Sequence, residues 1–165
     1  MPLLKNLETL DIFQDLTDDE LAEIQKLCRE EEYQRNDKLF TEGDPADDLW
    51  IIIEGKVDLR FEMPNAKPVT EESTVSSHDH VIPEAQVFGW SSFIPPYKMR
   101  LSAYCVTRKC RALKIDRESL SQLMERNTSI GYKIMKYTVK VVGFRFKQFQ
   151  DEVVKFMGMN MMNSW

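Results

Sequence analysis

A short stretch between Gly89 and Arg100 carries the residue types that could bind a small anion. Gly89 follows the apolar pair Val87–Phe88, and its freedom of φ allows a tight turn or a close approach of the backbone to a ligand. The next residues add an indole, two hydroxyl groups and backbone amides, which can surround an anion. Arg100 adds a guanidinium whose planar set of donors matches a phosphate or a carboxylate. We therefore predict a ligand site formed by Phe88, Gly89, Trp90, Ser91, Ser92, Arg100, Leu101 and Ser102.

Each of these side chains also has an ordinary structural interpretation. Ser91 and Ser92 are hydroxyl residues of the kind that cap a short helix. Arg100 could be a surface residue, and the indole of Trp90 could fill a pocket instead of lining one. The residue types alone leave both interpretations open.

A second set of residues, His78, His80 and Glu84, has a spacing at which imidazole and carboxylate groups bind metals. It resembles the first metal motif of the cupins, a family of jelly-roll enzymes. That motif needs a further histidine later in the chain, and the sequence contains only these two. The flanking glycines of the motif are also absent. A cupin-type metal enzyme is the weaker interpretation, and we predict no catalytic residues, no metal ligands and no required cofactor.

Composition limits the classes of function. The 165 residues provide one well-buried domain, and the net charge of −5 argues against direct nucleic-acid binding. No apolar run approaches the roughly 20 residues that span a membrane, and the N-terminus lacks the apolar core of a signal peptide. Three cysteines without a close pair favour reduced thiols. We expect a cytoplasmic protein with no membrane contact.

The elements that position the predicted site follow from the hydrophobic period. Thr17 and Glu20 have the spacing of a capping box at the start of a first helix. Asp116 is the expected N-cap of a second helix, which ends near Asn127. Short alternating segments separated by turn signals predict β-strands between them. The predicted strands span residues 31–34, 38–41, 49–53, 57–61, 80–82, 86–88, 101–106 and 111–115.

Residues 62–79 lose this pattern and contain prolines, acidic residues and a Ser/Thr cluster, so we predict a long mobile loop. We assign residues 1–129 to a β-barrel with N-terminal helices. Residues 130–165 form the C-terminal helix and tail of the same domain.

The last predicted helix, from about residue 129 to 157, carries two apolar stripes. One stripe can pack on the barrel: Ile130, Ile134, Tyr137, Val141 and Phe144. The other has heptad spacing and is uncovered in a monomer, which predicts a homodimer. The predicted interface residues are Met135, Val139, Val142, Phe146, Phe149 and Val153. Basic residues of this helix, including Arg145 and Lys147, are interpreted as a solvated face.

Four segments together resemble the cyclic-nucleotide-binding domain of Crp/Fnr-type regulators, kinase regulatory subunits and gated channels. The resemblance covers roughly residues 10–149. It implies an eight-stranded jelly-roll (double-stranded β-helix) barrel with flanking helices, whose long last helix dimerises and closes over the ligand. The matching residues are Phe40, Glu42, Gly43 and Asp44; Ile51, Ile52, Gly55, Val57 and Leu59; Phe88 and Gly89; and Ala112, Leu113, Ile115 and Asp116.

The resemblance also implies a ligand, cAMP or cGMP. In the family, a Phe-Gly-Glu sequence supplies the carboxylate that accepts the ribose hydroxyl, and a later arginine binds the cyclic phosphate. Here Trp90 occupies the place of the glutamate, whereas Arg100 matches the arginine. The segment also looks like a bacterial branch in which Gly-Trp-Ser replaces Gly-Glu.

These observations predict a sensor or regulatory module that couples the binding of a small anion to the position of the C-terminal helix. Crp/Fnr regulators carry a helix-turn-helix after this helix, and none follows here, so we expect a downstream protein partner and no direct contact with DNA. The main alternative is a ligand-free protein-interaction module with a degenerate pocket, which Trp90 fills. In neither case do we expect an enzyme.

Overall fold

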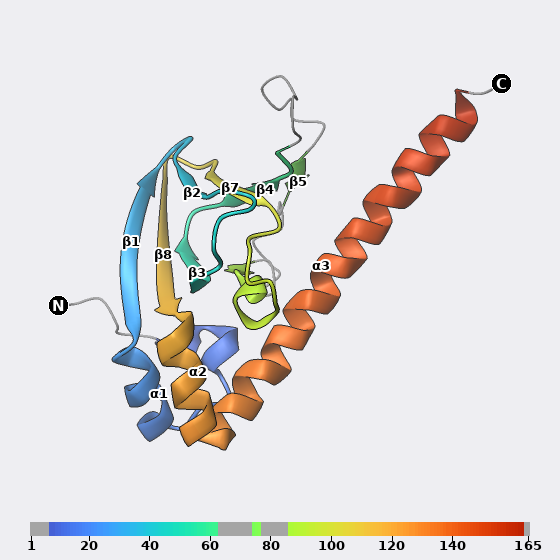
Figure 1. Ribbon diagram of the computed structural model, residues 1–165. Helices are drawn as coiled ribbons and strands as arrows, with labels where there is room; N and C mark the ends of the chain where they lie inside the picture. The colour runs from blue at the N-terminus through green and yellow to red at the C-terminus, as the bar shows by residue number, and fades with distance from the viewer. Residues whose placement is uncertain (1–6, 63–73, 77–85, 164–165) are drawn as a thin grey trace.

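Two four-stranded antiparallel sheets form the body of the chain in the computed structural model, which describes residues 7–62, 74–76 and 86–163 (Figure 1). The first sheet has the order β1 (Cys28–Gln34), β8 (Lys109–Asp116), β3 (Asp48–Glu54) and β6 (Val87–Phe88). The second has the order β2 (Lys38–Phe40), β7 (Ser102–Cys105), β4 (Val57–Arg60) and β5 (Thr74–Ser76). The predicted mainly-β domain is confirmed, and closure into an eight-stranded barrel stays a prediction.

Strand β3 is apolar on both faces because it separates two cores. Leu49 and Ile51 pack in a core shared with the helices, whereas Trp50 and Ile52 pack in a core between the sheets. Strand β4 instead alternates buried and half-buried residues, as its sequence predicts.

The helices gather at one end of the sheets, where α1 (Asp18–Gln25), α2 (Arg117–Arg126) and the start of α3 (Thr128–Met162) lie close together (Figure 1). Two short 3-10 turns, Leu7–Thr9 and Asp11–Phe13, precede α1. The predicted capping box is confirmed, because Thr17 N donates to Glu20 Oε2 at 2.9 Å and Glu20 N donates to Thr17 Oγ1 at 3.3 Å.

The predicted N-cap at Asp116 and the predicted end of the second helix at Asn127 are confirmed, and Asn127 also caps α3. The Asp116 carboxylate accepts a hydrogen bond from Ser119 N at 2.8 Å, and the Asn127 side chain accepts one from Ile130 N at 3.3 Å. Helix α3 begins at Thr128 and continues to Met162, five residues beyond the predicted end. Its distal part projects away from the sheets (Figure 1).

An ion pair fixes the first turns of α3 to α1. Lys133 Nζ lies 2.7 Å from Glu20 Oε2, and the Glu20 side chain is buried. The hydrogen bond from Lys133 is the largest cause that lowers the pKa of Glu20 from 4.5 to about 2. The capping residue of α1 therefore also anchors α3.

The predicted loop at residues 62–79 needs a correction. Thr74–Ser76 form strand β5, which pairs with β4. The β-branched residues Thr74 and Val75 favour a strand despite their polar surroundings. The other residues of this segment beyond Glu62, and the predicted strand at residues 80–82, lie outside the described residues.

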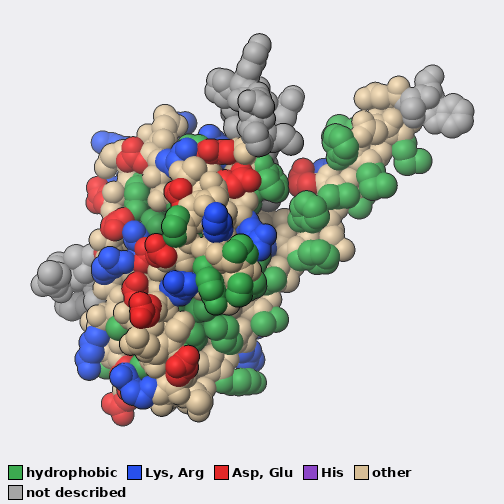
Figure 2. All heavy atoms as spheres, viewed as in Figure 1, with side chains coloured by type: hydrophobic (Ala, Val, Ile, Leu, Met, Phe, Trp, Pro, Cys, Tyr) green, Lys and Arg blue, Asp and Glu red, His purple; other side chains and the backbone are tan. Residues whose placement is uncertain are grey.

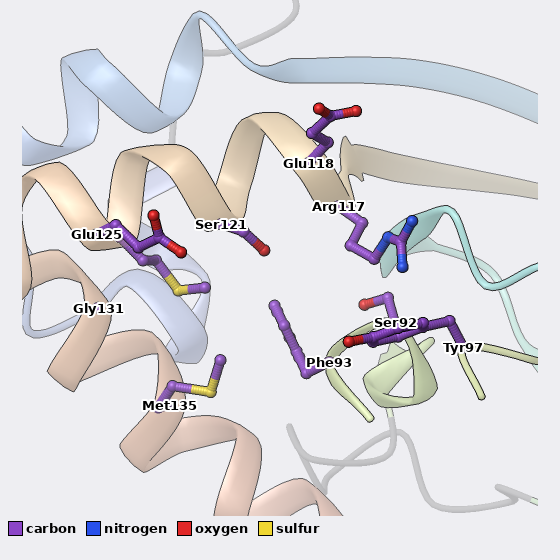
Figure 3. A pocket seen from close by; sticks show the side chains of 10 residues that line it. Ser92, Phe93, Tyr97, Arg117, Glu118, Ser121, Glu125, Gly131 and Met135 are labelled. Atoms are coloured by element: carbon purple, nitrogen blue, oxygen red, sulfur yellow. The ribbon is translucent and has the colours of Figure 1, made fainter. Parts of the chain in front are cut away.

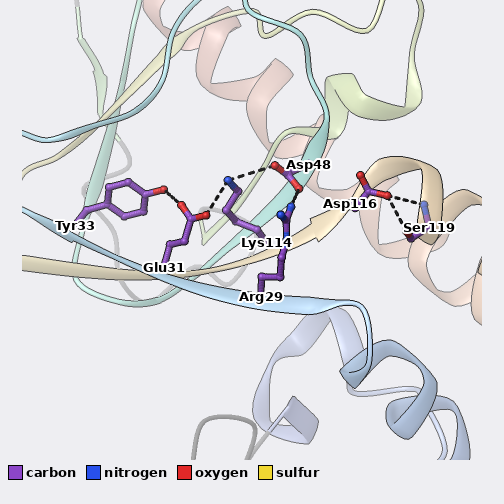
Figure 4. Close-up of polar contacts among 7 residues, drawn as sticks. All are labelled: Arg29, Glu31, Tyr33, Asp48, Lys114, Asp116 and Ser119. Carbon is purple, nitrogen blue, oxygen red and sulfur yellow. Dashed lines mark hydrogen bonds and ion pairs between the residues drawn. The ribbon is translucent and has the colours of Figure 1, made fainter. Parts of the chain in front are cut away.

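A charged network crosses three strands of the first sheet and holds the start of β3 (Figure 4). Asp48 pairs with Arg29 at 2.7 Å and with Lys114 at 3.4 Å. Lys114 also pairs with Glu31 at 3.2 Å, and its ammonium lies 4.4 Å from the centroid of the Trp50 ring. Asp48 is thereby held by one residue of β1 and one of β8, and its backbone oxygen lies directly beside Gly89.

Candidate ligand site

The turn after β6 requires glycine. Gly89 has a φ of +79°, and a Cβ atom at this position would lie 2.5 Å from the backbone oxygen of Asp48. The 3-10 turn η5 (Trp90–Phe93) follows, and Ser92 N donates to the Gly89 carbonyl at 2.9 Å. The turn at Gly89 can therefore pack directly against the backbone of Asp48 at the start of β3, because glycine has no side chain.

A cavity of about 270 Å³, here called the ligand cavity, lies between this turn, the sheets and α3. Its volume is close to the lower end of the range for small-molecule pockets, roughly 300–1,000 Å³. Four parts of the chain contribute to its wall. They are Phe40, Leu59, Phe61 and Phe88 near the sheets; Gly89, Trp90 and Ser91 in the turn; Met99, Arg100 and Leu101 before β7; and Val142, Arg145, Phe146 and Phe149 in α3.

The structure brings most of the predicted site residues to the ligand cavity. Those that line it are Phe88, Gly89, Trp90, Ser91, Arg100 and Leu101. Ser102 does not: it is fully buried, and its hydroxyl accepts a hydrogen bond from Glu42 N at 2.8 Å. Its role is to join β7 to the turn at Glu42, which the sequence pattern did not indicate.

Ser92 faces a second cavity of about 470 Å³, the back cavity, on the other side of the turn (Figure 3). Its hydroxyl is buried and has no hydrogen-bond partner among the described residues. Arg117 and Tyr97 stack nearby, with 4.5 Å between the guanidinium carbon and the ring centroid. The turn therefore separates two cavities, with Ser91 at one and Ser92 at the other.

Helix α3 places the predicted dimer residues in different surroundings. Val142, Phe146 and Phe149 line the ligand cavity. Met135 lines the back cavity and packs on the buried core, so it is covered within this chain. A helix drifts about 20° per heptad relative to a strict heptad stripe. The heptad residues consequently turn partly toward the body, and the dimer interface itself stays a prediction.

Arg145 is a residue of the ligand cavity that the sequence pattern did not identify. Its guanidinium carbon lies 4.8 Å from the centroid of the Phe88 ring, and its Nη2 donates to the Val87 carbonyl at 3.4 Å. Nη1 donates to Gln148 Oε1 at 3.0 Å. Burial lowers the pKa of Arg145 to about 10, so the group stays protonated at neutral pH. The signal was the sequence Phe144-Arg145-Phe146, a charge between two apolar residues.

The described residues that line the ligand cavity include two guanidinium groups and no carboxylate. Arg100 is exposed at its rim, whereas Arg145 is half-buried. A desolvated cation is stabilised by an anion more strongly than one in water. This arrangement favours an anionic ligand group near Arg145.

Metal chemistry finds no support in the part of the chain that the structure describes, which contains no cluster of His, Cys, Asp or Glu able to hold a metal. The residues His78, His80 and Glu84 lie outside that part.

The three cysteines are free thiols. Cys105 and Cys110 are buried, and Cys28 is half-buried. No helix among the described residues is long and apolar enough to cross a membrane.

Comparison with known proteins identifies the family of the chain. Residues 30–127 match the family model of the cyclic nucleotide-binding domain. A CRP-like cAMP-activated global transcriptional regulator of Mycobacterium tuberculosis is 26% identical over 125 residues. The match covers 76% of this chain and 52% of that relative. The chain thus spans about half the length of the curated relatives it matches.

Solved structures show the same fold. A proposed cyclic nucleotide-binding protein of Geobacter metallireducens GS-15 has a TM-score of 0.70 and 29% identity, with 88% of this chain and 99% of that chain covered. A cyclic nucleotide-binding domain of Methylobacillus flagellatus KT has a TM-score of 0.68 and 23% identity, covering 90% and 78% of the two chains.

Proposed function

Because the chain belongs to the cyclic nucleotide-binding domain family, we propose that it is a regulatory module in which an anion bound in the ligand cavity sets the position of α3. One observation carries this proposal. Val142, Arg145, Phe146 and Phe149 of α3 form one wall of the cavity, so a ligand there contacts the helix directly. A bound ligand can therefore change the position of α3 without acting through another helix or strand.

The mechanism is a shift between two positions of α3. An anion that contacts Arg145 and the neighbouring Phe146 stabilises the position in which α3 closes the cavity. The ligand changes the population of this position only by its difference in affinity for the two states. Arg145 supplies that difference, because its guanidinium contacts the ligand only when α3 closes the cavity.

The outer face of α3 is the proposed output surface. Figure 2 shows hydrophobic side chains along the projecting part of this helix. Four apolar residues follow one another at seven-residue intervals along α3, and a second helix would cover them. They are Tyr132, Val139, Phe146 and Val153, which are 68%, 71%, 58% and 37% exposed. Phe146 lies at the border of this face, because it also lines the ligand cavity. We propose a homodimer through this stripe, which keeps three of the residues that the sequence predicts for the interface.

We also propose a barrel topology, a ligand class and a type of partner for this module. The strand order of the two sheets supports an eight-stranded jelly-roll barrel. The cyclic nucleotides cAMP and cGMP are the first ligands to test, because the mycobacterial relative is described as cAMP-activated. The output passes to a downstream protein, and the role is regulatory rather than enzymatic.

Hydrogen–deuterium exchange tests the proposal on the intact chain. We expect residues 142–149 to gain protection when cAMP, cGMP or another small anion binds. A ligand at 100 times its dissociation constant should also stabilise the fold by about 2.7 kcal/mol. Arg145→Gln should abolish both effects, whereas Lys147→Gln, an exposed charge two residues away, should preserve them. Binding without any change in α3, or no binding by any anion, would favour the ligand-free interaction module.

A further inference from the structure

We infer that the ligand cavity accepts a small anion with an apolar body in preference to a cyclic nucleotide. This inference rests on the proposed function, because it names the ligand class of the same site. Three properties of the cavity carry it: the apolar wall, the small number of acceptors for sugar hydroxyls among the described lining residues, and the pair of guanidinium groups.

The wall of the cavity is mostly hydrophobic. Its side chains present aromatic rings and aliphatic groups to a ligand, and contact with such groups stabilises an apolar body in proportion to the area buried. A polar hydroxyl in the same place loses its hydrogen bonds to water and needs a partner in the protein. The apolar lining residues are Phe40, Leu59, Phe61, Phe88, Trp90, Met99, Leu101, Val142, Phe146 and Phe149.

Few acceptors face the cavity. The indole of Trp90 can only donate a hydrogen bond, so it cannot replace a carboxylate that accepts from a ribose hydroxyl. The carbonyl of Gly89 already accepts from Ser92 N, and the carbonyl of Ser91 accepts from Ile94 N at 3.2 Å. The buried Ser91 hydroxyl is the one remaining neutral polar side chain among the described lining residues. A ribose would therefore leave hydroxyl groups unpaired.

The charged groups define the other end of the ligand. Arg145 enters from α3 and Arg100 from the segment before β7, and both line the same cavity. Guanidinium groups bind carboxylate and phosphate with similar geometry, so either anion satisfies the site. A volume of about 270 Å³ corresponds to roughly nine groups of the size of a water molecule. One anionic group with a short alkyl chain or an aromatic ring fits this description.

Calorimetric titration of the full chain with matched probes tests the inference. The anionic probes are octanoate and 2-naphthoate, their neutral matches are octanamide and 2-naphthamide, and the nucleotides are cAMP and cGMP. We expect at least one anionic probe to bind tenfold or more tightly than both its neutral match and either nucleotide. Arg145→Gln should weaken this probe about tenfold and leave the amide unchanged. Lys147→Gln serves as the matched control, because it removes an exposed charge from the same helix.

The outcomes separate this inference from the proposed function. If cAMP or cGMP binds more tightly than both anionic probes and protects α3, the apolar-anion inference is wrong and the sensor function stands. Equal binding of each anion and its amide would also contradict the inference, because the guanidinium groups would then contribute nothing. If no compound binds at millimolar concentration, both the inference and the sensor function are wrong.

Discussion

The two ends of α3 differ in how the rest of the chain holds them. In the anchored part, residues 128–141, Ile130, Ile134 and Val141 are fully buried. In the projecting part, residues 150–162, every residue is exposed. The ligand cavity meets α3 at residues 142–149, between these parts. A ligand at this junction can therefore act on a helix that is fixed at one end and free at the other.

Removal of apolar side chains should give the largest contrast between the two parts. Ile134→Ala creates a cavity in the core and should lower the free energy of unfolding by about 3 kcal/mol. Val154→Ala in the projecting part should change it by less than about 0.5 kcal/mol, because Val154 is exposed. Urea denaturation measures both values. Similar losses for the two variants would show that a partner buries the projecting part.

Acid should affect the anchored part through Glu20. Its pKa is lowered to about 2 in the folded chain. A lowered pKa stabilises the fold above the ordinary value of 4.5, and this contribution is lost as the pH falls from 4.5 through 2. Glu20→Gln can keep the capping box but removes the ion pair with Lys133, so we expect a loss of about 1–3 kcal/mol at neutral pH.

The same variant should flatten the pH dependence of the free energy of unfolding between pH 5 and 2, measured by urea denaturation at each pH. Glu152→Gln removes the exposed pair of Glu152 and Lys155 in the projecting part and serves as the control. It should leave both the stability and its pH dependence unchanged. The same pH dependence in the Glu20→Gln variant and the wild-type chain would contradict the proposed anchoring by Glu20, because Glu62, Glu31 and Asp116 also have lowered pKa values.

A charge on the outer stripe should separate dimerisation from ligand binding. Val139 is exposed and does not line the ligand cavity. Val139→Glu should raise the dimer dissociation constant at least about tenfold, because a buried carboxylate would replace an apolar contact. Sedimentation velocity measures this change, and Lys147→Glu outside the stripe is the control. A wild-type chain that is monomeric at high concentration would contradict the dimer proposal.

The sequence predicts the elements of the fold well where the signal is local. The caps at Thr17 and Asp116 each satisfy a backbone amide three residues later, so the sequence alone identifies them. The buried stripe of α3 is similarly visible from its spacing. Strand β5 was missed because its β-branched residues lie in an otherwise polar segment and its partner strand β4 is not adjacent in the sequence.

The ligand site is less predictable because it depends on the rotation of α3 about its axis. The spacing of the apolar residues identifies two stripes on α3, but it does not show which of the residues between these stripes face the sheets. Arg145 therefore resembles an exposed basic residue in the sequence and lines a cavity in the structure. Ser102 shows the opposite error, because it was predicted to line the site and does not. Its hydroxyl instead accepts a hydrogen bond from the backbone amide of Glu42, sixty residues earlier in the chain.

Substitution of two glycines of α3 by alanine should give the smallest changes in the free energy of unfolding. A Cβ atom on Gly131 in the anchored part would lie 2.9 Å from the carbonyl oxygen of Met124, so Gly131→Ala forces α2 and α3 apart. We expect the free energy of unfolding to fall by about 1 kcal/mol after the gain in helix propensity is included.

A Cβ atom on Gly143, at the junction, would have no atom of the surrounding structure within 4 Å. Gly143→Ala should therefore raise the free energy of unfolding by about 0.5–1 kcal/mol. Urea denaturation should give opposite signs for the two variants. A loss at Gly143 would mean that another helix packs closely there, which would extend the dimer contact to the wall of the ligand cavity.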